Sequence, residues 1–113
     1  MIKTVLIGGE ERQVAFIRNA YAEIEKITGK NLLIGLENAD WNMLRAVIYA
    51  GLKWGLYKYD GVEPRPKFNL LIVGDWMDDD SFEPDGAIAQ FVALYQESLP
   101  KAKNVKAGEK PAS

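Results

Sequence analysis

Apolar residues recur at helical spacing in three segments of this chain, which commits much of the sequence to helices that share a core. Asp40 stands just before the second segment, where its carboxylate can accept hydrogen bonds from the exposed amides of a first turn. Gly29 follows the first segment, at the position where a helix commonly ends in the left-handed conformation, and Pro100 follows the third. The spacing predicts helices over about residues 17–28, 41–54 and 85–98.

The N-terminal stretch has a different pattern, typical of strands. Two β-compatible runs, residues 2–7 and 12–16, flank Gly8-Gly9, a pair suited to the positive φ angles of a hairpin turn. We therefore expect a short antiparallel hairpin over about residues 2–16.

The run "LLIV" at residues 70–73 is ambiguous. It has the composition of a buried strand, but Asn69 could cap a short helix in which Leu70, Val73 and Met77 form one stripe. We favour a helix over about residues 69–77. The predicted fold class is then α+β, mainly α, with a β-hairpin and about four helices.

Length sets the domain organisation. A chain of 113 residues can bury one core of ordinary size, and we expect a single globular domain over residues 1–100. Residues 101–113 are polar and lysine-rich without a periodic pattern, which predicts a flexible tail. Residues 31–39 could form a helical turn or a packed loop, and residues 57–66 carry Asp-Gly and two prolines, which predicts a turn and an extended connector.

The composition excludes many kinds of catalytic and metal-binding site. The chain has no cysteine and no histidine, so it lacks a thiolate nucleophile, disulfides, the usual zinc ligands and the commonest general base. We expect no catalytic residue and no cofactor. The formal net charge is −2, but the last thirteen residues hold four lysines and one glutamate, which leaves −5 on the rest and disfavours a nucleic-acid partner.

No apolar run approaches the roughly 18 residues of a membrane helix, and the N-terminus does not have the layout of a signal peptide. We expect a cytoplasmic protein without a membrane partner.

Gly29-Lys30 raises the question of a phosphate site. A phosphate loop needs Gly-Lys at the start of a helix, after a strand, with a second glycine five residues earlier and a following Ser or Thr. Here the pair ends a helix, residue 24 is Ile, and Asn31 follows the lysine. The pattern favours a helix end over a nucleotide site.

Carboxylates are concentrated between residues 75 and 85. They do not fit the register of an EF-hand, because Phe82 falls at the fifth ligand position when Asp78 is the first. The pattern is more typical of a solvated loop, and the weak candidates for a divalent metal are Asp75, Asp78 and Asp80.

Aromatic residues are numerous for a domain of this size, and part of them must be core. A stacking platform for nucleic acid at Tyr57-Lys58-Tyr59 is disfavoured by the acidic body, whereas a protein contact surface fits the composition. The candidates for protein binding are Trp54, Tyr57, Tyr59 and Trp76.

The order of these segments resembles that of the tail assembly chaperones of long-tailed bacteriophages, and is most similar to the group related to the tail-associated protein of gene transfer agents. The quoted segments are the hairpin start, "IRNAYAEIEKITGKNLL", "DWNMLRAVIYAGLKWG", "VGDWMDDD" and a last helix ending "ESLP", within about residues 10–99. The matching positions are Glu25, Thr28, Gly29, Lys30, Leu44, Tyr49, Ala50, Gly51, Leu52, Gly74 and Asp75.

The resemblance implies a binding function without catalysis. Such a chaperone of a phage or prophage binds the long helical tape-measure protein in the bacterial cytoplasm and helps to recruit tail-tube subunits during virion morphogenesis. Many members are made in two lengths by ribosomal frameshifting, and homo-oligomers are compatible with the class. We expect Gly29, Gly51 and Asp40 to serve structure. The alternatives are a generic protein-interaction adaptor and, less favoured, an acidic-loop metal-binding protein.

Overall fold

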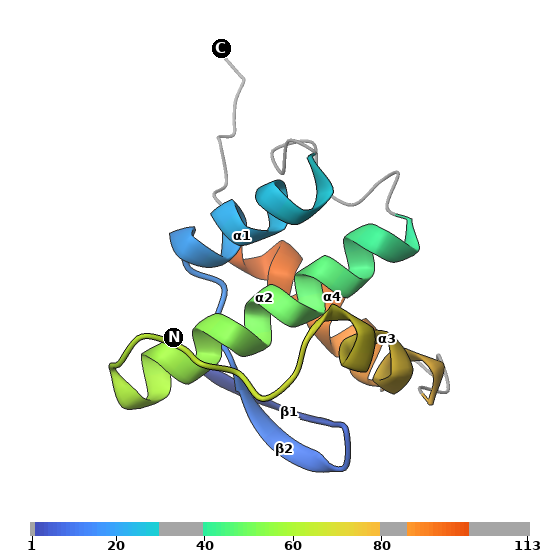
Figure 1. Ribbon diagram of the computed structural model, residues 1–113, viewed down its shortest axis with the longest axis horizontal. Coiled ribbons are helices and arrows are strands. Elements are labelled where there is room, and N and C mark those ends of the chain that lie inside the picture. The colour runs from blue at the N-terminus through green and yellow to red at the C-terminus, as the bar shows by residue number, and fades with distance from the viewer. Residues whose placement is uncertain (1, 30–39, 80–85, 100–113) are drawn as a thin grey trace.

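The computed structural model describes residues 2–29, 40–79 and 86–99. These ranges contain a two-stranded antiparallel hairpin followed by helices, so the predicted α+β, mainly α fold is confirmed. Figure 1 shows α2 crossing the centre of the molecule, with α1 on one side and the hairpin on the other. The elements are β1 (Lys3–Ile7), β2 (Glu10–Val14), α1 (Arg18–Thr28), α2 (Trp41–Asp60), α3 (Leu70–Asp78) and α4 (Ala87–Ser98).

The hairpin is tighter than the sequence suggested. Gly8 and Gly9 have φ angles of 64° and 81°, and this two-residue turn lets pairing begin at once with Ile7 opposite Glu10. The second strand therefore spans Glu10–Val14 and not residues 12–16. The next residue, Ala15, donates its backbone N–H to the carbonyl of Gly51 in α2 (3.0 Å), so the chain turns from strand pairing to helix packing there.

Helix α2 is six residues longer than the predicted 41–54, so the prediction of a turn and connector over residues 57–66 is wrong for residues 57–60 and holds from Gly61 onward. Tyr57 and Tyr59 belong to the last turns of the helix. The helix ends at Gly61, which has φ 75° and donates its N–H to the carbonyl of Tyr57 (2.7 Å). Gly55 does not break the helix, because it is buried where α2 meets β2.

Local capping places the other helix ends close to the predicted residues. Asp40 accepts a hydrogen bond from the N–H of Met43 (2.8 Å) at the start of α2. Asn69 does the same for the N–H of Ile72 (2.9 Å), which confirms the helical interpretation of the "LLIV" segment. Helices α1 and α4 begin at Arg18 and Ala87, within two residues of the predicted starts. The predictions for residues 31–39 and 101–113 lie outside the described residues.

The core surrounds α2 on several sides, because α2 packs against α1, β2, α3 and α4. One cluster lies between α2, the hairpin, α3 and α4, and the other between α1, α2 and α4. Each fully buried aliphatic side chain contributes about 1.5–3 kcal/mol relative to exposure. The first cluster contains Val5, Ile7, Val14, Ile48, Leu52, Phe68, Val73, Met77, Ile88 and Phe91, and the second Ala20, Ile24, Met43, Ala46, Val47, Ala50 and Tyr95.

Small residues control how closely α2 approaches its neighbours. A Cβ built on Gly51 would lie 2.7 Å from the ring of Phe16, and one built on Gly55 would overlap the carbonyl oxygen of Gln13 in β2. On the α1 side, Lys53 and Glu23 form an ion pair (2.8 Å) whose side chains are largely shielded from solvent. These contacts fix the position of α2 relative to both the hairpin and α1.

Two glycines inside helices give opposite predictions on substitution by alanine. Gly55→Ala should lower the free energy of unfolding by about 1–3 kcal/mol, because the overlap with the Gln13 carbonyl outweighs the gain in helix propensity. Gly74→Ala should raise it by about 0.5–1 kcal/mol, because its Cβ would meet only the Cδ of Arg45, at 3.7 Å. Urea unfolding of both variants provides the measurement, and changes of the same sign would contradict the described packing.

A third glycine tests the end of α1. Gly29 has φ 71° and open space where a Cβ would lie, so Gly29→Ala should cost only the backbone strain of about 1 kcal/mol. Gly29→Asn is the control, because asparagine tolerates the left-handed conformation better and should cost less. Thermal unfolding that ranks the alanine variant equal to the wild type would argue against a left-handed end.

Candidate functional site

The acidic candidates for a metal site do not form a cluster in the described part of the chain. Asp75 and Asp78 are exposed on α3, and Asp80 lies outside the described residues. Within residues 2–29, 40–79 and 86–99, no group of three or more acidic, His or Cys side chains is placed to hold a metal ion. The metal-binding alternative therefore gains no support from these residues.

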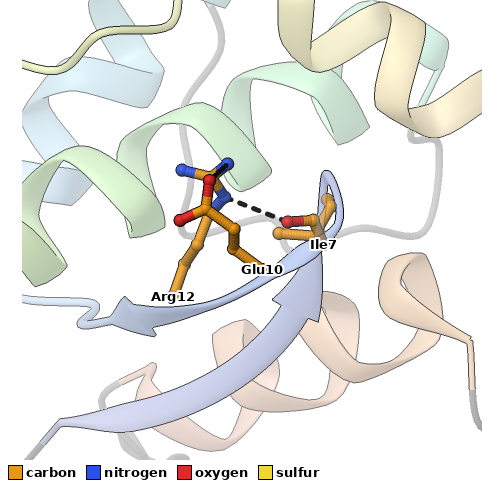
Figure 2. Close-up of polar contacts among 3 residues, drawn as sticks. All are labelled: Ile7, Glu10 and Arg12. Carbon is orange, nitrogen blue, oxygen red and sulfur yellow. Dashed lines mark hydrogen bonds and ion pairs between the residues drawn. The ribbon is translucent and has the colours of Figure 1, made fainter.

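Trp76 is half-buried and connects α3 to the hairpin. The Arg12 guanidinium lies over its ring, 4.4 Å from the centroid, and a Cβ on Gly8 would overlap the indole. Figure 2 shows how Arg12 also closes the hairpin turn: its Nε donates to the carbonyl of Ile7 (3.0 Å), and its Nη2 pairs with Glu10 (3.4 Å). The geometry gives Trp76 a packing role at the hairpin turn.

Trp54 is also half-buried. Its ring lies edge-on to Tyr57, with the centroids 5.7 Å apart, and the Lys53 ammonium is 5.6 Å from the centroid of the Trp54 ring. The structure therefore brings Trp54 and Tyr57 together but leaves Trp76 on a different part of the molecule.

The remaining aromatic candidates lie at the C-terminal end of α2. Tyr57 and Tyr59 are 36% and 65% exposed, and Val62, just after the helix, is 60% exposed. We call these three residues the far-end surface. A shallow cavity of about 370 Å³ lies beside it, lined by Leu56, Asp60, Val62, Glu63, Pro64 and Arg65.

The other end of α2 forms one wall of a groove against α3, with a volume of about 460 Å³. The cap at Asp40 fixes the first turn of α2, which places Trp41 and Arg45, one turn apart, on the same side of the helix. Gly74 lacks a side chain, so the stem of Arg45 can lie along α3. The α2/α3 groove is lined by Trp41, Asn42, Arg45, Gly74, Met77 and Asp78.

Two large apolar side chains are exposed at this groove. Trp41 is 61% exposed on the α2 side, and Leu71 is 71% exposed on α3. Leu71 precedes Gly74 by three residues and Asp78 by seven, so all three lie on one face of α3. A largely exposed indole and a largely exposed leucine near a concave surface favour the binding of an apolar partner.

Arg45 supplies the positive charge of the groove. Its Nη2 donates to Oδ1 of Asn42 (3.1 Å), and its Nε is shielded from solvent without a hydrogen-bond partner among the described residues. Asp78 lies on the opposite wall. The groove therefore has a cation on the α2 side, a carboxylate on the α3 side and apolar atoms between them, with no nucleophile among the described residues of its lining.

Apart from Asp78, a weak metal candidate, the residues of the groove were not among the sequence candidates. Trp41, Arg45 and Leu71 were missed because nothing local shows that the start of α2 meets the middle of α3. One signal was available for Leu71: four consecutive apolar residues in a short helix cannot all face a core on one side. Val73 is buried, and Leu71 points to the opposite side of α3.

Tyr95 is the one group among the described residues with a clearly shifted pKa. Burial, followed by the neighbouring Tyr21 and Glu25, raises the pKa of Tyr95 from 10.0 to about 12. The side chain is fully buried, edge-on to Phe16 and Tyr21. It is therefore part of the core and not an accessible acid or base.

Comparisons with protein families, curated proteins and solved structures find no match for this chain. Within the described ranges, no helix combines the length and apolar character needed to cross a bilayer.

Tyr95→Phe tests the burial of this hydroxyl. At neutral pH the variant should be as stable as the wild type or slightly more so, because the hydroxyl has no partner among the described residues. The folded protein keeps the Tyr95 proton up to about pH 12 and the unfolded chain only to about pH 10. The raised pKa therefore contributes stability below about pH 10, which is lost as the pH rises through about 12.

The measurement is urea unfolding of both proteins at a series of pH values between about 8 and 12. The wild type should lose more stability than Tyr95→Phe over the upper part of this range. Parallel losses would show that the folded state does not favour the neutral Tyr95.

Proposed function

We propose that this protein is a non-enzymatic tail assembly chaperone, which covers the apolar stripe of a long helical tape-measure protein while tail-tube subunits are recruited. The observation that carries the proposal is the α2/α3 groove, which is lined by the exposed Trp41, together with the exposed Leu71 on the face of α3 that carries Gly74 and Asp78. A phage or prophage protein of this kind works in the cytoplasm of the bacterial host.

The shape and chemistry of the groove suit a helix. Recognition of an amphipathic helix uses apolar side chains at i, i+3, i+4 and i+7, which insert into a groove between two elements of the binding protein. Burial of apolar area contributes about 25 cal/mol per Å², and tryptophan is among the residues that most often dominate such interfaces. A partner that covered Trp41 and Leu71 would gain affinity from the burial of apolar area, and no chemical reaction would be needed.

The sequence resemblance supports the same proposal. Several of its matching positions lie at the packing of α2 with its neighbours: Gly51 contacts Phe16, Leu52 is in the core, and Gly74 lines the groove. The resemblance therefore includes residues that pack α2 against its neighbours and one that lines the groove, in agreement with a family whose members bind other proteins.

Co-expression tests the proposal. The probe is the longest helix-rich protein encoded next to this chain in its genome, produced with and without it, and the readout is the fraction of the probe that stays soluble. The wild type should keep the probe soluble. Trp41→Ala/Leu71→Ala should lose most of this effect, because the exposed apolar area at the groove is removed.

The matched control is Tyr57→Ala/Tyr59→Ala, which removes exposed aromatic area from the far-end surface and should keep the effect. Exposed substitutions usually change stability by no more than about 0.5 kcal/mol, so thermal unfolding should show that both variants are folded. A probe that precipitates equally with and without the wild type would end the chaperone proposal in favour of an adaptor. Loss of the effect in the tyrosine variant alone would move the binding site to the far-end surface.

A further inference from the structure

We infer that the α2/α3 groove selects an amphipathic helix with lysine or arginine along one side of its apolar stripe, through an acidic margin formed by Asp75 and Asp78. This inference rests on the proposed function, because it concerns the partner of the same groove. It adds the charge of that partner, which neither the fold nor the resemblance supplies.

These carboxylates lie at the C-terminal end of α3. Helices α1 and α2 carry Lys26 and Lys58 in their last turns, where a cation complements the exposed carbonyl groups of a helix end. Helices α3 and α4 have no basic residue in their last turns, and at the end of α3 the acidic margin occupies this position. Carboxylates are unfavourable next to the carbonyl end of a helix, and a cation from outside would relieve this repulsion.

The carboxylates at the end of α3 also repel one another. Asp75 precedes Asp78 by three residues and Asp79 by four, which makes them neighbours on the helix surface. All three are exposed, and no ion pair joins any of them to another described residue. The protein therefore presents an unneutralised negative surface at the side of the groove.

Negative charge and exposed apolar area lie on the same side of α3. Asp78 lines the groove, and Leu71 and Asp75 lie on the same side of α3. A helix that lays an apolar residue against Leu71 and Trp41 brings its own neighbours, three or four residues along, close to Asp75 and Asp78. Lysine or arginine at those neighbouring positions would complete the contact.

The α2 wall sets the orientation of the partner. Arg45 lies there, and the described lining of the groove contains no second cation. A basic flank placed over α2 would meet a like charge, whereas the same flank placed over α3 meets the acidic margin. Apolar contacts supply most of the affinity. The charges determine which amphipathic helix binds preferentially and how it is oriented in the groove.

The test uses two synthetic peptides of about 20 residues, without tryptophan, with leucine at i, i+3, i+4 and i+7. The two peptides differ only in the residues along one side of the stripe, which are lysine in one and glutamate in the other. Their dissociation constants are measured from the tryptophan fluorescence of the full-length protein. We expect the lysine peptide to bind at least about tenfold more tightly at low salt, with a smaller difference at about 0.5 M salt.

Charge-reversal variants locate the source of this preference. Asp75→Lys/Asp78→Lys should reverse it, so that the glutamate peptide binds more tightly. The matched control is Glu63→Lys/Glu97→Lys, which changes the net charge equally at two exposed positions outside the groove lining and should keep the preference for lysine. Lysines at the end of α3 suit the helix end, so the first variant should remain folded, as circular dichroism would show.

The outcomes separate the two proposals. Equal binding of both peptides, or an equal loss of preference in the two charge-reversal variants, overturns the acidic margin as the selecting surface and leaves the groove as a helix-binding site. If neither peptide binds, this inference is overturned together with the use of the groove in the proposed function.

Discussion

The close contact between α2 and the hairpin is the constraint on which the rest of the structure depends. Gly55 meets the backbone of β2, Gly51 meets Phe16, and the carbonyl of Gly51 accepts the N–H of Ala15. With the hairpin seated there, Val5, Ile7 and Val14 join one core with residues of α2, α3 and α4. A two-stranded hairpin alone is marginal in water, so its stability comes from this helix.

The same central position of α2 explains why its two ends are exposed. Its middle is covered by α1, the hairpin, α3 and α4, whereas a helix of 20 residues is about 30 Å long and extends past these neighbours. Trp41 at one end and Tyr59 at the other are left in solvent. The short α3 reaches the first of these ends and forms a groove with it, and Arg45 and Asp78 give that groove opposite charges on its two walls.

The elements themselves were largely predictable because their signals are local. Asp40 and Asn69 cap the helices they precede, and Gly29 ends α1 in the left-handed conformation with its N–H on the carbonyl of Glu25 (2.7 Å). The length of α2 was not predictable in this way, because Gly55 weakens a helix unless something approaches it closely. That approach involves β2, about 40 residues earlier in the sequence.

By itself, the sequence determined the hairpin, the helices found in the described ranges, and a chemistry without histidine or cysteine. Capping residues and apolar periodicity act over a few residues, and composition does not depend on the fold at all. Only the tertiary structure decided which aromatic side chains are packed and which are exposed. Trp76 is held under Arg12, while Trp41 faces solvent beside α3. The physical reason is that exposure depends on which surfaces meet across the fold, and residues 41 and 74 become neighbours only when α2 and α3 pack together.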